Sequence, residues 1–91
     1  MIVTVEEMKG YLRVDFPDDD ELIKDLIRTS EKHCLDILRS DDPEELEQNE
    51  EGKLAVMFMT AYLYEHRDDA NYTSLNLTLR ALLFGSRGVG F

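Results

Sequence analysis

The adjacent pair His33-Cys34 is the first place in the chain where side chains could bind a metal or provide an activated nucleophile. Zinc prefers imidazole nitrogen and thiolate sulfur, and a thiolate beside a histidine can attack an electrophile. In a helix, however, neighbouring side chains point about 100° apart, and no third ligand is spaced to join these two. We therefore interpret both as packing residues, and we expect neither a metal nor a cofactor.

A run of four acids, Asp18-Asp19-Asp20-Glu21, offers the carboxylate oxygens that calcium prefers. The run lacks the alternating spacing and the central glycine of an EF-hand loop. Asp18 followed by Glu21 instead matches a capping box, and acids in a first turn interact favourably with the helix dipole. We predict that these residues begin a helix and hold no metal.

Tyr64-Glu65-His66-Arg67 is the nearest approach to a catalytic motif, and it comes at the end of an apolar segment. No second group is spaced to orient it, and the chain has neither a glycine-rich phosphate loop nor an H-E-x-x-H motif. These residue types suit a helix end, where tyrosine buries its ring and keeps its hydroxyl in water while Arg and His complement the last carbonyl groups. We predict that the protein is not an enzyme.

The helix that ends there spans residues 53–67, and only Thr60 interrupts its apolar run from Leu54 to Tyr64. Met, Ala and Leu favour a helix over a buried strand, and the apolar residues point to every side of that helix. Eleven residues are too few for a membrane span, which needs ~17–25. We predict a central helix covered by the rest of the chain or by neighbouring copies, and no membrane contact.

The first helix should begin at Thr4, where Glu7 completes a capping box. Pro17 disfavours a helical conformation at Phe16, so this helix should end near Val14. The chain should then turn before the acidic cluster begins the next helix.

Three further segments show helical patterns. A wide apolar arc predicts a long helix at about 19–39, and a stripe of leucines predicts a last helix at about 74–84, closed by Gly85. Between them, an Asp-Pro-Glu-Glu start predicts a short extra helix at 43–49. The alternative is one continuous helix over 43–67.

These patterns together predict an all-α fold, a small bundle of about four helices around the central buried helix 53–67. Residues 1–91 should form a single α-helical domain with a flexible tail at about 86–91. The residues that we expect in the core are Leu22, Leu26, Phe58, Leu63, Leu79 and Leu82.

The charge is strongly negative and unevenly distributed. The net charge is −10, and residues 1–51 hold 17 acids and 6 bases, whereas residues 52–91 hold 3 acids and 4 bases. Such a surface repels phosphate backbones and anionic lipids, which argues against nucleic-acid binding. A single cysteine and the absence of a signal-peptide pattern at the N-terminus indicate an intracellular protein.

Several residues are candidates for contacts between subunits, because a chain this short cannot cover all of its apolar faces. One is an apolar residue that lies among basic residues on the outer side of the second helix. Two lie on the outer side of the last helix, and three are arginines of the less acidic half. The candidates are Leu35, Leu77, Phe84, Arg67, Arg80 and Arg87.

Several segments, in order over nearly the whole chain, match the pattern of one known family. They are Val3-Thr4-Val5-Glu6-Glu7-Met8-Lys9 with Tyr11-Leu12-Arg13-Val14-Asp15, Asp20-Glu21-Leu22-Ile23, the helix end Tyr64-Glu65-x-Arg67, and Ala81-Leu82-Leu83 followed by Arg87. The Tyr-Glu-x-Arg end after an apolar run is the most specific of them. In these segments the chain resembles the head–tail connector family of tailed bacteriophages, whose members are often labelled possible DNA-packaging proteins.

This resemblance implies a structural virion-assembly protein, encoded by a phage or prophage. It would form a homo-oligomeric ring below the portal protein and join it to head-closure or tail proteins, completing the head after DNA packaging. DNA would pass through the channel without specific binding. The protein would lie at the head–tail junction of the virion, and in the bacterial host cytoplasm during assembly.

Two alternatives from other classes follow from the charge and the helices. An acidic DNA-mimic inhibitor would occupy a partner's DNA groove, and it would act as a monomer or dimer without rings. A small regulatory helical module, such as an antitoxin, would need a dedicated partner protein. Neighbouring genes for portal and capsid proteins would separate the connector from both.

Overall fold

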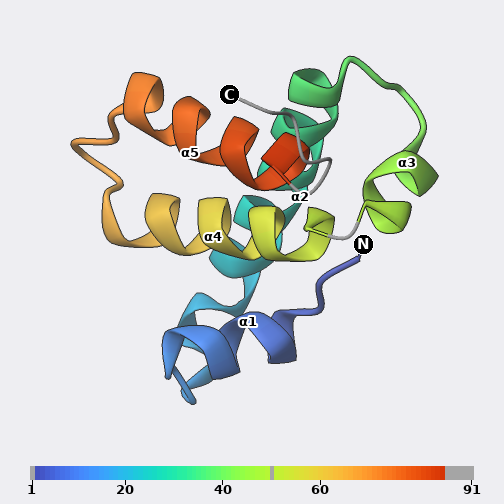
Figure 1. Ribbon diagram of the computed structural model, residues 1–91. Coiled ribbons are helices and arrows are strands. Elements are labelled where there is room, and N and C mark those ends of the chain that lie inside the picture. The colour runs from blue at the N-terminus through green and yellow to red at the C-terminus, as the bar shows by residue number, and fades with distance from the viewer. Residues whose placement is uncertain (1, 50, 86–91) are drawn as a thin grey trace.

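The computed structural model describes residues 2–49 and 51–85, and every regular element in these two ranges is a helix (Figure 1). The elements are α1 (Val5–Leu12), a 3₁₀ turn η1 (Pro17–Asp19), α2 (Asp20–Leu38), α3 (Pro43–Gln48), α4 (Gly52–Glu65) and α5 (Tyr72–Gly85). The predicted all-α bundle is confirmed, including the short extra helix after Asp42.

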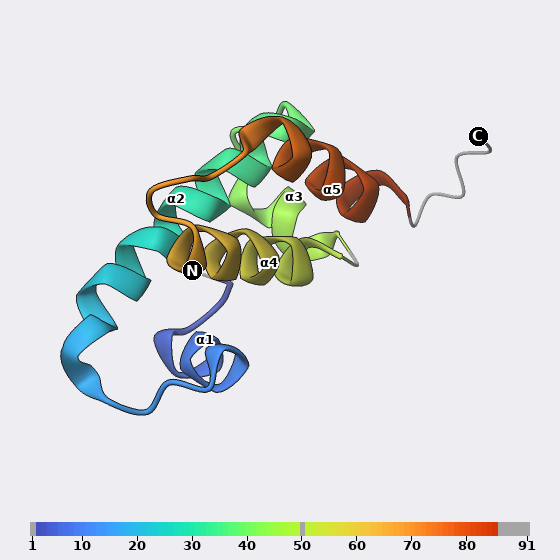
Figure 2. The ribbon, with the colours of Figure 1, turned by 90° about the vertical axis from the view of Figure 1, so that its left-hand side faces the viewer.

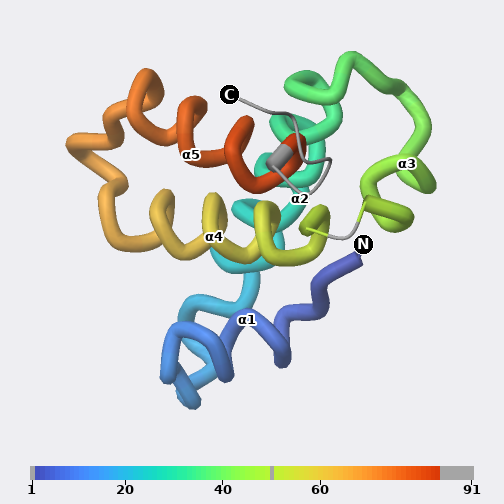
Figure 3. Tube along the Cα trace, in the orientation of Figure 1, coloured from blue at the N-terminus to red at the C-terminus, as the bar shows by residue number. Residues whose placement is uncertain are grey.

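The fold is arranged around α4. Helices α4 and α5 run antiparallel side by side, α2 crosses them steeply, and α1 lies on the other side of α4 from α5 (Figures 1 and 2). The chain passes through α3 beside the first turn of α4, as the tube in Figure 3 shows. Because α4 contacts all four other α-helices, and α2 most extensively, it is the central helix of the bundle.

The other helices cover most of α4, but they leave one strip open. Seven of its residues are buried, and they face α2, α5, α3 and α1. On the remaining side, Leu54 is 43 % exposed and Phe58 is half-buried. The chain alone therefore does not cover the central helix on every side.

Small polar side chains lie where α2 crosses α4. Thr60 is fully buried and donates its hydroxyl to the carbonyl of Val56 at 2.7 Å, and its Oγ1 lies 3.0 Å from Oγ of Ser30. Both hydroxyls are thus hydrogen-bonded, which removes most of the cost of burying them. Their small size also lets the two helices approach closely.

The six expected core residues occupy two environments. Leu63 and Leu79 are buried, whereas Leu26, Phe58 and Leu82 are half-buried and pack against the core. Leu22 is also only half-buried. The fully buried side chains of α2 form a narrower stripe than the predicted apolar arc, and they are Ile23, Ile27, Ser30 and Cys34. Ile23 and Ile27 each follow by one position the residues that we expected in the core, Leu22 and Leu26.

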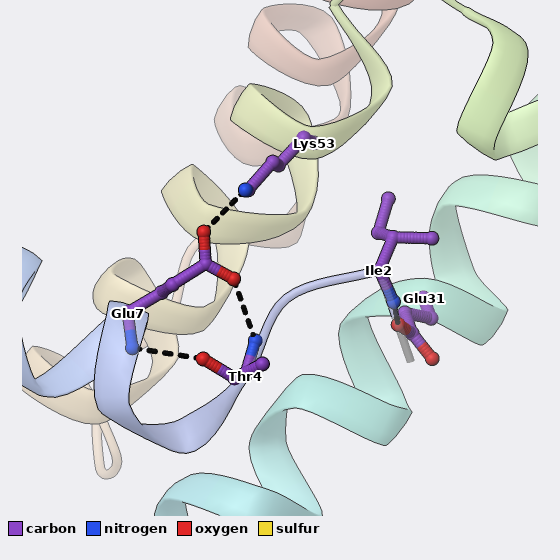
Figure 4. Close-up of polar contacts among 5 residues, drawn as sticks. All are labelled: Ile2, Thr4, Glu7, Glu31 and Lys53. Carbon is purple, nitrogen blue, oxygen red and sulfur yellow. Dashed lines mark hydrogen bonds and ion pairs between the residues drawn. The ribbon is translucent and has the colours of Figure 1, made fainter.

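The first helix begins as predicted and ends early. Thr4 and Glu7 form the expected capping box (Figure 4). The helix ends at Leu12, two residues before Val14, because Arg13 adopts a left-handed conformation with φ of 59°. The amide of Val14 then donates to the carbonyl of Lys9 at 2.9 Å, which closes the helix end.

The capping box predicted for the second helix is wrong. Asp18 lies in η1, α2 begins at Asp20, and the N-cap residue Asp19 makes no capping bond with its side chain. The carboxylates are used in tertiary contacts instead: Asp19 accepts a hydrogen bond from Tyr64, and Asp20 pairs with Lys9 at 2.8 Å. The predicted motif is absent because Asp18 lies within the 3₁₀ turn and not at the N-cap position.

Helices α3 and α4 are separate, so the alternative of one continuous helix over 43–67 is wrong. Asp42 caps α3 by accepting from the amide of Glu44 at 3.0 Å. At the start of α4, a Cβ added to Gly52 would lie 2.1 Å from the carbonyl oxygen of Leu46. Only glycine permits so close an approach of the two helices without a shift of the backbone.

The last helix begins two residues earlier than predicted. Asn71 caps it, accepting from the amide of Ser74 at 3.1 Å, and α5 runs from Tyr72 to include Gly85. The predicted tail at 86–91, with the candidate Arg87, lies outside the described residues.

Candidate functional site

The His33-Cys34 pair links helices and is not part of a metal-binding cluster. Within residues 2–49 and 51–85, no group of three or more His, Cys, Asp or Glu side chains could hold a metal ion. His33 Nε2 lies 2.6 Å from Oδ1 of Asn76, which joins α2 to α5. Cys34 is fully buried, and desolvation raises the pKa of its thiol to about 12. The thiol is therefore neutral near pH 7 and unsuited to nucleophilic chemistry.

The Tyr-Glu-x-Arg helix end ties α4 to the start of α2. The hydroxyl of Tyr64 donates to Oδ2 of Asp19 at 2.5 Å, and this hydrogen bond raises the pKa of Tyr64. The guanidinium of Arg67 lies 5.5 Å from the centre of the Tyr64 ring. The hydroxyl is thus used in a tertiary contact, which the sequence analysis missed because Asp19 lies 45 residues away.

Two neighbouring contacts fix the α4–α5 connection. The Tyr62 hydroxyl accepts from the amide of Asn71 at 2.8 Å, and the Tyr62 ring stacks on His66 with 4.5 Å between the ring centres. These contacts therefore give Tyr62 and His66 a structural role at the end of α4.

The N-terminal segment is held against both α4 and α2 (Figure 4). Glu7 forms an ion pair with Lys53 at the start of α4, and the amide of Ile2 donates to Glu31 of α2 at 2.7 Å. The Lys53 contact, together with the bond from the Thr4 amide, holds the pKa of Glu7 below its ordinary value. Lys53 is thus paired within its own chain.

The arginine candidates differ in their surroundings. The central helix ends at Glu65, two residues earlier than predicted, so Arg67 is exposed in the turn after α4, where it lies over Tyr64. Arg80 is exposed on α5, and it forms no ion pair with any residue that the structure describes. Of the two, Arg80 has the charge that is more available to another molecule.

The apolar candidates also separate into two kinds. Leu77 is 67 % exposed on α5, on the side opposite the buried Leu75, Leu79 and Leu83. Phe84 is half-buried and packs against the core. Leu35 was predicted on an outer face, but it is half-buried and packs against the core. Ile2 of the N-terminal segment and Leu46 of α3 line a hollow together with Leu35, so both segments lie beside this part of α2.

A surface hollow between α1 and α4 was not predicted from the sequence. Its volume is about 390 Å³. We call it the α1/α4 hollow, and it is lined by Tyr11, Leu12, Arg13, Phe58, Ala61, Tyr62 and Glu65. Tyr11 is 47 % exposed there, so a partly hydrophobic recess lies on the open strip of α4. The missing information was how α1 packs on α4, which no local pattern contains.

None of the helices in the described ranges is both long and apolar enough to cross a membrane.

An all-helical bundle with exposed apolar side chains, and with its reactive residue types used in packing, has the features of a structural assembly protein. The family model of the phage gp6-like head-tail connector proteins matches residues 2–86, so the chain belongs to this family. The search of curated proteins and the search of solved structures each give no match.

Membership of this family defines the general role. These are structural proteins of phage assembly and not a class of enzymes, and their place is between the head and the tail of the virion. The chain therefore acts through contacts with other phage head and tail proteins.

Proposed function

We propose that this protein forms a homo-oligomeric ring below the portal protein, and that it joins the portal to head-closure or tail proteins after DNA packaging. The observation that carries the proposal is the exposed apolar surface on a member of the connector family. Leu77, Tyr72 and Leu54 are 67 %, 51 % and 43 % exposed, respectively. Burying such side chains against neighbouring copies would stabilise an assembly by ~25 cal/mol per Å² of apolar surface.

The charge distribution supports a channel through which DNA passes without binding. The first 51 residues hold 17 acids, and the helices α1, α2 and α3 carry most of them. An acidic wall repels phosphates within the screening length of about 10 Å, so DNA slides past it without specific contacts. We accordingly expect no measurable affinity for double-stranded DNA at 150 mM salt, on the order of physiological ionic strength.

Light scattering over a concentration series, alone and with the portal protein of the same phage, tests the ring. We expect the measured mass to rise with protein concentration to a fixed multiple of the subunit mass, and we expect annular particles in electron micrographs. A strict monomer under both conditions would contradict the proposal. Fluorescence anisotropy with labelled duplex DNA tests the channel surface, and salt-dependent binding would show that the acidic half does not face the DNA.

A further inference from the structure

The outer side of α5 is an unusual surface on this acidic protein. Leu77 projects from it, with Arg80 and Ala81 one turn later and Thr73 one turn earlier. We call these four residues the α5 outer face. Their neighbours Ser74 and Thr78 are also small, so another surface could approach α5 closely around Leu77.

Charge distinguishes this face from the other helices. The segment Tyr72–Gly85 contains no Asp or Glu, whereas each other α-helix carries at least one acid. Two copies, each with a net charge of −10, repel one another unless the surfaces that meet are neutral or complementary. The α5 outer face can therefore approach a second copy with little repulsion, and Arg80 favours a carboxylate opposite it.

The α1/α4 hollow has the complementary character. Phe58 and Tyr62 provide aromatic surface, Tyr11 is partly exposed beside them, and Glu65 lines the hollow from the last turn of α4. Glu65 is exposed, and it forms no ion pair with any other residue described. Among the described residues that line the hollow, Glu65 on α4 is the only one with a carboxylate, and Arg13 lines the α1 side.

We propose that the α5 outer face of one copy docks into the α1/α4 hollow of the next copy. Leu77 enters the hollow, and Arg80 pairs with Glu65. This inference rests on the proposed self-association, and it adds which two surfaces meet. Leu77 and Arg80 are three residues apart on one helix, so both can reach the same site on the neighbour.

The positions of the two surfaces favour a head-to-tail contact. Helix α5 lies on one side of α4 and α1 lies on the other, as both ribbon views show (Figures 1 and 2). A contact between two different surfaces leaves the hollow free on one copy and the α5 outer face free on the other, so it can repeat around a ring. A two-fold contact of α5 with α5 would instead use the same surface of both copies and would stop at a dimer.

Cross-linking of paired cysteine variants tests the contact directly. Ala81→Cys protein is mixed with Tyr11→Cys protein and treated with a short bis-maleimide; a second mixture uses Thr73→Cys in place of Ala81→Cys, so that Leu77, Arg80 and Glu65 are all retained. All three sites are exposed, so the fold should be retained, and circular dichroism checks this. The native Cys34 is buried with a raised pKa and should not react.

We expect a covalent dimer in both mixtures. We expect none when Ala81→Cys protein is mixed with Glu44→Cys protein, whose exposed site lies on α3. A dimer formed as readily by Ala81→Cys protein alone would show a two-fold α5 contact and overturn the inference. Rings without these cross-links would overturn the inference and leave the proposed function intact. Cross-linked dimers without rings would support the contact and contradict the ring.

Discussion

At the scale of single residues, the two glycines at helical positions 10 and 52 show how context decides the effect of one substitution. A Cβ at Gly52 would lie 2.1 Å from the carbonyl oxygen of Leu46, whereas a Cβ at Gly10 would meet nothing within 4 Å. We expect Gly52→Ala to destabilise the fold by about 1–3 kcal/mol, because α3 and α4 must move apart. Gly10→Ala should be neutral or stabilise by up to about 1 kcal/mol, because alanine is the better helix former.

Urea denaturation of both variants and the wild type measures these effects. Because each variant adds the same methyl group to a helix, Gly10→Ala is a matched control for Gly52→Ala. Equal stability of the two variants would contradict the close contact of α3 with α4.

Glu7 gives an acid-dependent contribution to stability. Its pKa lies below the ordinary value because of Lys53 first and the Thr4 amide second. A carboxyl group with a depressed folded-state pKa stabilises the fold above its unfolded-state pKa, and this contribution is lost as the pH falls through the folded-state pKa. The Lys53–Glu7 pair should therefore contribute fully above the ordinary pKa of glutamate, about 4.3, and its contribution should decrease as the pH falls below that value toward the lowered folded-state pKa.

Thermal melts of the wild type and of Glu7→Gln between neutral pH and pH 3 test this contribution. The wild type should have the higher melting temperature at neutral pH, and the difference should shrink as the solution becomes more acidic. A difference that is independent of pH would show that the charge of Glu7 does not contribute, because only the charged form of Glu7 is lost as the pH falls.

At the scale of helices, much of the fold could be predicted because its signals are local. The apolar run identified α4, and Asp42-Pro43 marked the start of α3. The capping box predicted at Asp18 is absent because the chain forms a 3₁₀ turn there and α2 begins only at Asp20. The neighbouring carboxylates of Asp19 and Asp20 contact the distant Tyr64 and Lys9. A prediction from neighbouring residues alone contains no information about such contacts.

The candidate site was less predictable than the fold. The exposure of Leu77 follows from helical periodicity, because it lies opposite the leucine stripe of α5. Leu35 likewise lies opposite the apolar side of its helix, so periodicity predicted that it would be exposed. In the folded chain it packs against the core, with Ile2 and Leu46 beside it. The α1/α4 hollow depends on the path of the chain after α1, so it could be found only in three dimensions.

Two residues of α4 separate the stability of the fold from assembly. Leu63 is 6 % exposed, so Leu63→Ala should cost about 2–5 kcal/mol of unfolding free energy by leaving a cavity in the central helix. Phe58 is half-buried on the open strip, so Phe58→Ala should cost less stability and weaken self-association instead.

Chemical denaturation and light scattering on the same samples distinguish these two effects. If Leu63→Ala were nearly neutral, α4 would not be the buried centre of the bundle. If Phe58→Ala left the oligomer unchanged, the hollow would not be the receiving surface.

At the scale of the whole molecule, the imbalance of charge determines which surfaces can meet. Contacts between first halves alone would bring together surfaces that each hold 17 acids and 6 bases, so the less acidic half should take part in any interface. Lys53 is paired with Glu7 in its own chain, and Arg67 lies over Tyr64. Arg80 is therefore our first choice for the assembly residue, with Arg67 as a second proposed contact.

Arg67→Glu distinguishes these roles. If Arg67 acts mainly on Tyr64, the substitution should lower stability by less than about 1 kcal/mol, as for an exposed charged contact, and leave the oligomer intact. Loss of the oligomer with unchanged stability would instead make Arg67 an interface residue. Sedimentation combined with urea denaturation measures both quantities.

Sedimentation velocity on a charge-exchange series is the most direct test of head-to-tail assembly. The series comprises the wild type, Arg80→Glu, Glu65→Arg and the variant carrying both substitutions, each at low and at high salt. We predict that either single substitution dissociates the oligomer while the helical signal is kept, that the double substitution restores it, and that high salt reduces the differences. Oligomers of unchanged size in both single variants at low salt would contradict the account.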